Sequence, residues 1–412
     1  MAVGARLAAL GLMLATFSAG LPAQRPAQGP AQAELEVYVV TLGQGALYWE
    51  KYGHNMLYFR DASTGLDLAF NWGSFDFTRP GYLQRVIVGD PQYWVDTLPG
   101  RLVFDFYRRH DRSITLQRLA FTPAQAARAL ALARDNAREE NKYYRYDYFL
   151  DNCSTRIRDL VDTVLDGALR RAWADTTALT YRSETVRLLD DMKLPQLGVI
   201  LALGRPADVP LTVWESGFIP MRLRDALRGA VADGAPVVTE ERMVFTSARW
   251  SDGADATRVW IWYALIGAAL AIDVAGLAML AGRHRGIDIA WRVEAAAWTA
   301  LTGVFGVVVL LGWLTTRHTF WYDNENLLLA NPLSLAVTVL TLMALRNARW
   351  NRPAAIAAIV VAMTSALALV VKTLPGAQDN LAFIALLLPP NFAVAFGLWR
   401  QVGSRVAGHG SR

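Results

Sequence analysis

Cys153 is the residue best suited to covalent chemistry, because it is the only cysteine in the 412-residue chain. It stands in the string LDNCSTR, followed by apolar residues at helical spacing. Either Asp151 or Asn152 would cap such a helix and place the sulfur in its first turn, where free backbone N–H groups and the helix dipole favour a thiolate. A lone cysteine is buried and inert, paired with another chain, or used as a nucleophile. We favour the nucleophile, because the helix start and the polar neighbours suit it.

A thiol that attacks a carbonyl needs a base within hydrogen-bonding reach. The chain has five histidines, and the membrane topology described below places His284 and His409 in the cytoplasm. His110 stands among charged residues of a predicted turn, where a solvated surface position is the simpler account. His54 begins a predicted strand directly after Gly53, on a rigid scaffold. We therefore predict that His54 is the base, and His318 stays as a loop candidate.

Two residues are candidates for orienting the imidazole. If Arg60 pairs with Gly65 across the predicted turn, His54 falls opposite Asn71, whose amide oxygen can accept a hydrogen bond from the ring. A register slip of one residue would move Asn71 to the other face. Asp76 is the alternative, with a solvated loop position as its simpler role. The oxyanion hole would combine the backbone N–H of Cys153 with a second donor that the sequence does not identify.

The elements that must position these residues predict a mixed α+β domain. Residues 34–42 are rich in strand formers, and residues 55–59 and 66–72 flank a turn cluster, which predicts a hairpin. A second hairpin is expected from residues 101–108 and 114–119. The string Thr122-Pro123-Ala124-Gln125 supplies an N-cap, a first-turn proline and a capping-box glutamine, and opens a helix to about Glu140.

The second half of the chain reads as a membrane domain. The composition, 53% hydrophobic and 19% charged, excludes a disordered chain and is too apolar for an ordinary soluble enzyme. Five apolar segments are each long enough to cross a bilayer as a helix. They are Val259–Ala281, Val293–Thr316, Asn326–Leu345, Pro353–Val371 and Asn380–Trp399.

The N-terminus and the arginines give one orientation. Residues 1–24 have the layout of a secretory signal peptide, with an uncleaved anchor as the alternative, and residues 25–33 read as a linker. We then expect an exported domain over 34–250 and a five-span domain over 251–412. The loops on the expected cytoplasmic side carry nine arginines, whereas the outer loops carry only Arg317 and Lys372. This predicts a membrane protein with an extracytoplasmic first domain and a cytoplasmic C-terminus.

The membrane half contains polar residues with two interpretations. The outer loop 315–326, which reads TTRHTFWYDNEN, presents His318, Asn324 and Asn326 either as substrate contacts or as part of an aromatic interface belt. Asp273 falls inside the first span, where a carboxylate usually faces a protein interior or water. Pro389–Pro390 should break or kink the fifth span.

Several classes of function lack support in the sequence. The net charge is +5, but no stripe of Lys and Arg interleaved with aromatic residues predicts nucleic acid binding. No metal site is predicted, because the exported domain has no second cysteine and no H-x-x-x-H spacing. Neither a G-x-G-x-x-G string nor a P-loop is present, so we expect no nucleotide cofactor.

The order of the motifs, with a histidine on a strand first and Asn-Cys opening a helix later, resembles the circularly permuted NlpC/P60 superfamily, which includes the lecithin:retinol acyltransferase group. More closely, the strings YGH (52–54), FNWGSFDF (70–77) and YFLDNCSTRIRD (148–159) resemble the periplasmic domain of Lnb-type bacterial lipoprotein N-acyltransferases. The resemblance covers about Glu34 to Thr246. The membrane half, with Asn324, Asn326 and Pro332 after an outer loop, is also similar to the family's.

The resemblance implies a permuted NlpC/P60-like α+β fold with Cys153 and His54 as the catalytic pair. It also implies the substrates: a phospholipid acyl donor and a diacylated lipoprotein, whose α-amino group accepts the chain from a Cys153 thioester. Asn152, His318, Asn324 and Asn326 are the candidate substrate-binding residues. Two alternatives stay open: a membrane-anchored cysteine hydrolase acting on cell-wall peptides or lipids, and a non-catalytic scaffold in which Cys153 is simply buried.

Overall fold

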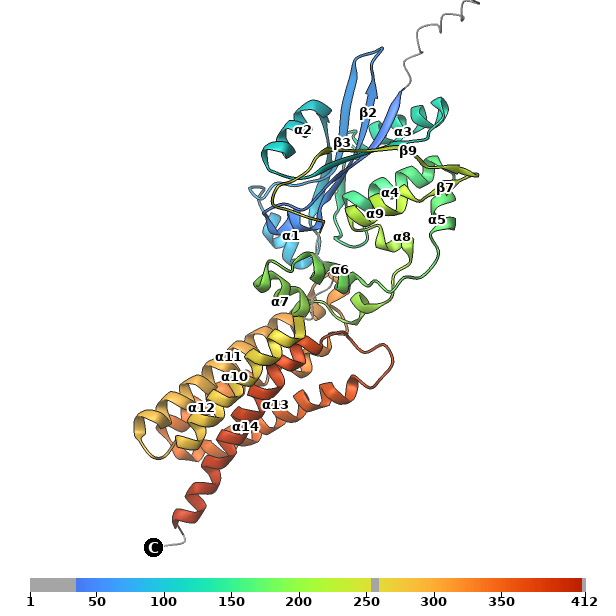
Figure 1. Ribbon diagram of the computed structural model, residues 1–412. Coiled ribbons are helices and arrows are strands. Elements are labelled where there is room, and N and C mark those ends of the chain that lie inside the picture. Colours follow the sequence, from blue (N-terminus) through green and yellow to red (C-terminus); the bar gives the residue numbers. More distant parts are fainter. Residues whose placement is uncertain (1–34, 253–258, 410–412) are drawn as a thin grey trace, which may run out of the picture.

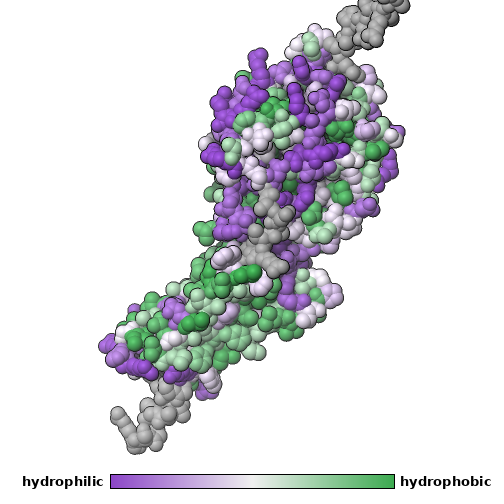
Figure 2. All heavy atoms as spheres, viewed as in Figure 1, coloured by the Kyte–Doolittle hydropathy of each residue, from purple (hydrophilic) through white to green (hydrophobic). Residues whose placement is uncertain are grey.

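The computed structural model describes residues 35–252 and 259–409 and has two parts, a sheet-containing domain and a helical bundle (Figure 1). On the face seen in Figure 2, the bundle is mainly apolar and the first domain is mainly polar. The predicted signal peptide, 1–24, and linker, 25–33, lie outside the described residues. The two parts bear out an α+β domain followed by a helical membrane region.

The first domain is built on a seven-stranded sheet in which every neighbouring pair is antiparallel. The order across the sheet is β6-β4-β3-β2-β1-β5-β9. The predicted hairpin is present as β2 and β3. The strands are β1 Glu36–Leu42, β2 His54–Asp61, β3 Leu66–Ser74, β4 Gln92–Pro99, β5 Ile114–Leu119, β6 Tyr143–Arg145 and β9 Val238–Phe245. The short strands β7 Val231–Ala232 and β8 Ala235–Pro236 form a separate pair.

Helices cover both faces of this sheet, as the alternation of side chains along its strands requires. Leu57 and Phe59 of β2 are buried in the core shared with α3, α4 and α9, whereas Met56 and Tyr58 are buried against α2. The helices of this domain are α1 Tyr82–Val88, α2 Gly100–Arg109, α3 Pro123–Asn136, α4 Cys153–Val164, α5 Ala168–Ala172, α6 Tyr181–Leu188, α7 Lys193–Ala202, α8 Val213–Ser216 and α9 Pro220–Arg228. The 3-10 helices η1 Tyr48–Tyr52 and η2 Arg205–Asp208 complete it.

The prediction of a second hairpin is wrong, because residues 101–108 belong to helix α2 and not to a strand. Its inward residues Val103, Phe104 and Tyr107 have helical spacing and pack on the sheet. The expected helix after Thr122 is confirmed as α3, with Thr122 and Gln125 forming the capping box.

The bundle contains α10 Val259–Leu280, α11 Arg285–Thr315, α12 Ser334–Arg346, α13 Asn351–Val371 and α14 Leu381–His409. Of these described helices, four are long and apolar enough to cross a membrane. α12 has 13 residues and is shorter than a bilayer-crossing helix. The predicted third span therefore corresponds to α12 preceded by non-regular chain and the 3-10 helix η4 Glu325–Leu328.

Pro389 and Pro390 do not end the last helix, since both lie inside α14. A proline has no N–H to donate to the carbonyl four residues earlier, which leaves those of Ala385 and Leu386 without a helical donor. Both carbonyls lie against Gly267 of α10, where an added Cβ would be 2.3 and 2.7 Å from the two oxygens. Glycine thus allows α10 and α14 to approach closely at this point.

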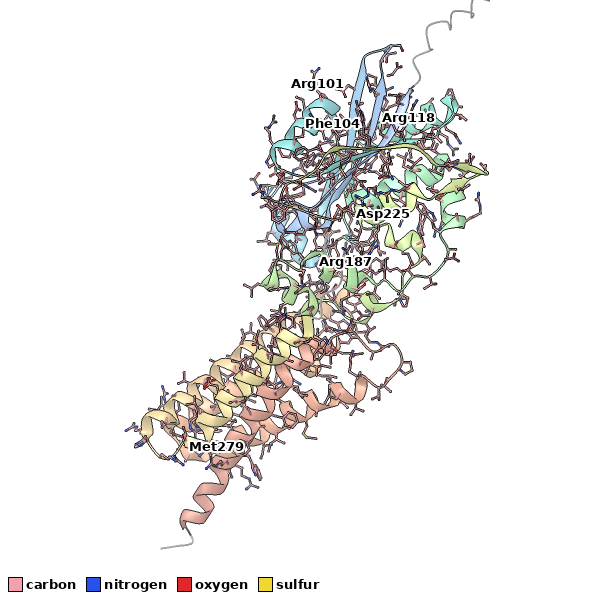
Figure 3. The ribbon with its side chains drawn as sticks, in the orientation of Figure 1. Arg101, Phe104, Arg118, Arg187, Asp225 and Met279 are labelled. Atoms are coloured by element: carbon pink, nitrogen blue, oxygen red, sulfur yellow. The ribbon has the colours of Figure 1, made fainter. Side chains whose placement is uncertain are left out.

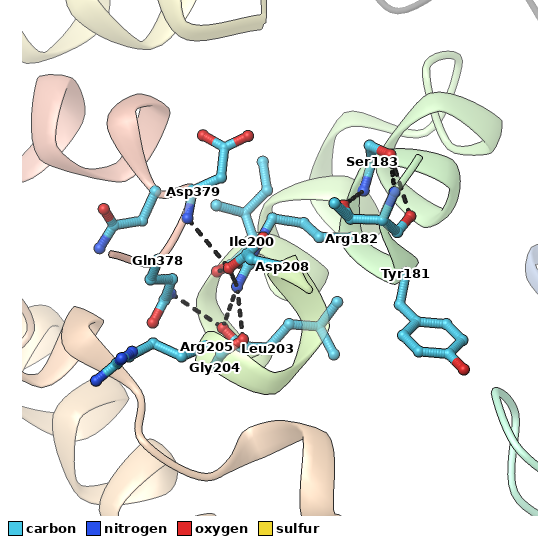
Figure 4. A network of polar contacts seen from close by, with 12 residues as sticks. Tyr181, Arg182, Ser183, Ile200, Leu203, Gly204, Arg205, Asp208, Gln378 and Asp379 are labelled. Carbon is cyan, nitrogen blue, oxygen red and sulfur yellow. Dashed lines mark hydrogen bonds and ion pairs between the residues drawn. The ribbon is translucent and has the colours of Figure 1, made fainter. Parts of the chain in front are cut away.

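The first domain is joined to the bundle by a network of polar contacts (Figure 4). Arg182 of α6, 3% exposed, donates to the Asp208 carboxylate at 2.7 and 3.0 Å and to the carbonyl oxygens of Leu203 and Gly204. From the loop between α13 and α14, Gln378 donates to the Leu203 carbonyl, and the backbone N–H of Asp379 donates to Asp208. These contacts hold the bundle against the domain in addition to the covalent connection that precedes α10.

Candidate functional site

Cys153 is the first residue of α4, as predicted. Asn152 is its N-cap and accepts hydrogen bonds from the backbone N–H groups of Ser154 and Thr155 at 2.8 and 3.0 Å. Its amide nitrogen donates to the carbonyls of Tyr148 and Phe218. All hydrogen-bonding positions of this amide are used within the protein, so Asn152 caps α4, and its expected role as a substrate contact stays a prediction.

The environment of the Cys153 sulfur differs from the expectation of a thiolate. The side chain is 8% exposed, and burial raises the pKa of the Cys153 thiol to about 11. Backbone N–H groups of Asn55, Ser154 and Cys153 and the nearby charge of Arg112 act in the opposite direction. Burial outweighs these contributions, because a thiolate loses more hydration than a few amide donors replace. The thiol is therefore protonated at neutral pH.

His54 lies at the start of β2, where the ring is held by Asn71 of β3. The distance between His54 Nε2 and Asn71 Oδ1 is 2.5 Å, and Asn71 Nδ2 donates to Ser74 Oγ at 3.1 Å. An amide oxygen can only accept a hydrogen bond, so Nε2 carries the proton and donates it to Asn71. The Nδ1 lone pair is left as the basic site.

The register behind this contact differs from the expected one. Arg60 pairs with Asp67, not with Gly65. The shift is two residues, and because side chains alternate with a period of two, Asn71 stays on the face of His54.

Cys153 and His54 come from elements on different faces and meet at the end of the sheet. His54 shares the face covered by α2, whereas α4 covers the other face. Gly73, with φ of +100°, lies between them, and a Cβ added there would be 3.7 Å from Cys153 Cβ and 3.9 Å from His54 Cε1. The missing side chain leaves a space about the size of a methyl group beside Cys153 and His54. No hydrogen bond joins these two side chains within the described residues.

The imidazole is neutral in this environment. Burial lowers the pKa of His54 to about 4, and the positive charge of Arg112 acts in the same direction, while the hydrogen bond to Asn71 opposes both. Arg112 is 4% exposed and donates to the Gly43 carbonyl, with the Glu50 carboxylate 3.6 Å away. At neutral pH the site thus combines a neutral thiol, a neutral imidazole and a buried guanidinium.

Tyr144 of β6 is a site residue that the sequence reasoning missed. Its hydroxyl lies 3.9 Å from the position of a Gly73 Cβ, so it faces the same space as the thiol and the imidazole. The residue is 9% exposed, and its oxygen has no hydrogen-bond partner among the described residues. Arg156 stacks over the Tyr144 ring at 4.2 Å and is paired with Asp151. An unpartnered buried hydroxyl at this position can donate to a carbonyl oxygen that enters the space.

Asp76 does not orient the imidazole, contrary to the alternative expectation. Its carboxylate accepts hydrogen bonds from the Thr78 backbone N–H and hydroxyl at 2.8 and 2.6 Å, which lower the pKa of Asp76. Asp76 therefore closes a turn after β3, because an aspartate side chain readily accepts a hydrogen bond from the backbone N–H two residues later.

Asn324 and Asn326 are held inside the protein, and their expected role in substrate binding stays a prediction. Both are almost fully buried, at 2% and 0% exposed. Asn324 donates to the carbonyls of Leu201 and Ala202, and Asn326 to those of Ile200 and Leu201. These carbonyls belong to the C-terminal end of α7, where a helix lacks intrahelical donors. The two asparagines therefore dock the outer loop onto α7.

His318 also serves the contact between the domains. Its Nε2 lies 2.9 Å from the Val86 carbonyl of α1, and its ring stacks on Trp321 with centroids 4.9 Å apart. The Tyr148 hydroxyl lies 3.3 Å from Nδ1. Both ring nitrogens are engaged, so this histidine fixes the loop, and its expected role as a substrate contact stays a prediction.

Across residues 35–252 and 259–409, no three His, Cys, Asp or Glu side chains gather in a way that would hold a metal ion. The described side chains that gather at this end of the sheet are Cys153, His54, Asn71, Tyr144 and Arg112.

These features define a multi-pass membrane protein whose sheet-containing domain carries a cysteine, a histidine and an asparagine at one end of the sheet. Comparison with family models gives a match of residues 30–191 to the Lnb N-terminal periplasmic domain and of residues 264–401 to the Lnb transmembrane domain. The chain carries both domains in order and belongs to the Lnb family, which confirms the resemblance. No curated protein and no solved structure matches the chain. The further likeness to NlpC/P60 proteins stays an expectation from sequence.

Proposed function

We propose that the protein is an acyltransferase that moves an acyl chain from a phospholipid, through a Cys153 thioester, to the α-amino group of a lipoprotein N-terminal diacylglyceryl-cysteine. The observation that carries this proposal is the arrangement of Cys153, His54 and Asn71 around the space left by Gly73. The substrate classes come from the resemblance to Lnb-type enzymes.

The first step is attack of the Cys153 sulfur on the ester carbonyl. His54 takes the thiol proton at Nδ1 as the sulfur–carbon bond forms, since neither group is charged beforehand. Charge that develops on the carbonyl oxygen is stabilised by the Tyr144 hydroxyl and by the backbone N–H of Cys153. The tetrahedral intermediate then expels the alcohol oxygen of the lipid, which receives the proton from His54.

The second step transfers the chain to nitrogen. The neutral amine attacks the thioester carbonyl, His54 removes a proton from the nitrogen, and the Cys153 sulfur leaves as the thiolate and takes this proton from His54. An amide forms and the thioester breaks, so no oxidant, metal or nucleotide is consumed. A thioester suits this exchange, because the thiol is a good leaving group for an incoming amine.

The membrane half holds the site beside both substrates, which lowers the entropic cost of the encounter. We infer five passes across the membrane, with the domain of residues 34–250 in the periplasm. The loops on either side of α12 and α13 both contact this domain, through Asn326 and Gln378. The chain between these two loops must therefore cross the membrane towards the cytoplasm and come back. Because α13 is the outward pass, α12 supplies the inward pass. The C-terminus then lies in the cytoplasm of a bacterial inner-membrane protein.

The test is mass spectrometry of the full-length protein in phospholipid vesicles, with and without a synthetic diacylated lipopeptide. We expect an acyl adduct on Cys153 that disappears when the peptide is added and reappears as amide product. Cys153→Ala should form neither species, and His54→Ala should form the adduct much more slowly. Full amide formation by Cys153→Ala would refute the proposal, and free fatty acid without amide would show a hydrolase.

A further inference from the structure

Four large apolar side chains are exposed on the side of the periplasmic domain that lies next to the bundle. Phe77, Leu83 and Ile87 are 59%, 69% and 60% exposed, and Trp49 of η1 is 45% exposed. Leu83 and Ile87 lie four residues apart in α1 and thus on one side of this helix. Trp49 extends the surface, since its ring lies 5.4 Å from that of Phe77. We call these four side chains the apolar face.

The position of α1 relative to the bundle places the apolar face at the height where a bilayer ends. α11 ends at Thr315, and two residues later the backbone N–H of Arg317 donates to the Val88 carbonyl of α1 at 2.8 Å. An added Cβ at Gly89 would lie 2.9 Å from the backbone of Arg317 and His318, so this contact is close. In Figure 1, α1 and α7 lie on the side of the domain nearest the bundle.

The charges beside the apolar face suit the phosphate groups of lipids. Arg85, Arg145 and Arg317 surround the single carboxylate of Asp90 at 4.0, 3.9 and 3.3 Å. Their side chains are 52%, 45% and 68% exposed, so the cluster has two positive charges in excess that face solvent. An apolar helix flanked by arginines is typical of a segment that lies in the membrane interface.

Aromatic side chains lead from the apolar face to the sulfur. Phe77 contacts Phe75, Phe75 contacts Tyr93, and Tyr93 stacks on Tyr146, with ring centroids 4.8, 5.1 and 4.2 Å apart. Tyr146 lies near enough to Cys153 for a charge on the sulfur to raise the pKa of its hydroxyl. Gly73, where an added Cβ would contact Cys153, is only four residues from Phe77, a reach of at most about 14 Å.

We propose that the apolar face lies in the headgroup region of the periplasmic leaflet, and that acyl chains reach Cys153 along these aromatic side chains. The second part rests on the proposed function, whereas the first does not depend on any chemistry. Burial in the interface would remove from water an apolar patch that soluble surfaces seldom expose.

The immersion is tested with spin labels in full-length protein in phospholipid vesicles. Cys153→Ala leaves no thiol in the chain, so single cysteines can be introduced as Leu83→Cys and Ile87→Cys. Leu102→Cys on α2, 55% exposed, is the matched control, because α2 with Arg101 and Phe104 lies far from the bundle (Figure 3). Leu311→Cys on α11, 51% exposed, marks the lipid environment.

We expect labels at 83 and 87 to be relaxed by oxygen more than by a water-soluble nickel complex, like the label at 311 and unlike that at 102. Labels that behave like the one at 102 overturn the proposal. Labels shielded from both agents also overturn it, because they show that a protein partner or a second copy covers the face.

The route to Cys153 is tested with a chain that keeps this cysteine. The double variant Leu83→Ser/Ile87→Ser should need at least about tenfold more vesicle phospholipid for half-maximal formation of the acyl adduct, a loss of about 1.4 kcal/mol. Leu102→Ser should leave this requirement unchanged. An unchanged requirement in the double variant overturns the route. If the unaltered chain forms no adduct, the proposed function fails, while the spin-label result still decides immersion.

Discussion

His54 Nε2 lies 2.5 Å from Asn71 Oδ1, and this contact decides which nitrogen of the ring is basic. The amide oxygen of Asn71 faces the imidazole, while its nitrogen donates to Ser74 Oγ. The contact thereby prepares Nδ1 for proton transfer without putting a charge beside the ring.

Removing the Asn71 amide should slow formation of the acyl adduct. We expect Asn71→Ala to lower the rate by about 10- to 100-fold, a part of the 10²–10⁴ that a positioned base contributes. Asn141→Ala, at an exposed loop position, is the control. Single-turnover mass spectrometry measures the rate, and an unchanged rate in Asn71→Ala would remove this residue from the site.

The pH dependence of the first step follows from the two opposite pKa shifts. Neutral His54 is the active form, and since its pKa is lowered to about 4, the rate should fall only when the pH drops towards 4 and His54 becomes protonated. Alkylation of Cys153 by iodoacetamide in His54→Ala should increase about tenfold per pH unit from pH 7 to 10, because the thiolate forms with a pKa of about 11. A plateau of alkylation already at pH 7 would instead indicate a thiolate in the resting site.

Replacing Tyr144 by phenylalanine should lower catalysis without lowering stability. Its hydroxyl has no partner in the described structure, so Tyr144→Phe removes no hydrogen bond and should leave the unfolding temperature unchanged. The loss of one donor to the developing oxyanion should lower kcat by about 10²–10³ with little change in KM. Tyr143→Phe on the same strand is the control. A lower unfolding temperature with normal kcat would assign Tyr144 a structural role.

The close approach at Gly204 predicts a loss of stability at the junction. A Cβ at this residue would lie 1.8 Å from the Tyr322 carbonyl oxygen of the outer loop. We expect Gly204→Ala to separate the loop from η2 and to expose it to proteolysis in detergent. Gly229→Ala is matched, because Gly229 has the same φ of −95° and no atom near its added Cβ. Equal proteolysis of both variants would contradict the expected clash.

Asn326→Ala should destabilise the protein without affecting substrate binding. The substitution leaves buried carbonyls of α7 without their donor, at a cost of about 1–3 kcal/mol in the free energy of unfolding. Thermal unfolding in detergent micelles measures this loss, with Asn141→Ala as the reference. The KM for phospholipid, measured well below the unfolding temperature, should stay unchanged. A raised KM with normal stability would restore the role in substrate binding that the sequence suggested.

Local patterns predicted the elements around the site well. The capping signals before α3 and α4 gave both helix starts, and the elimination among five histidines selected the one that lies near Cys153. The β2–β3 register was wrong by two residues, yet Asn71 was still identified, because an even shift preserves the side-chain face.

What the sequence could not predict depends on tertiary packing. Residues 101–108 fit both a strand and a helix pattern, and their contact with the sheet decides for α2. Tyr144 is one of four tyrosines in the string YYRYDY, and only the fold shows which hydroxyl lies beside Gly73 and Cys153. The caps made by Asn324 and Asn326 join residues more than 120 positions apart, which no local pattern reveals.

Arg182 and its partners have a further consequence for how substrates arrive. Since one buried guanidinium gathers Asp208 and the end of α7 while Gln378 and Asp379 bind the same segment, the domain is not free to swing on a hinge above the bilayer. The Cys153 sulfur then stays at a fixed distance from the membrane surface. Each lipid, and each lipoprotein that follows it, must rise out of the leaflet by the same amount to be processed.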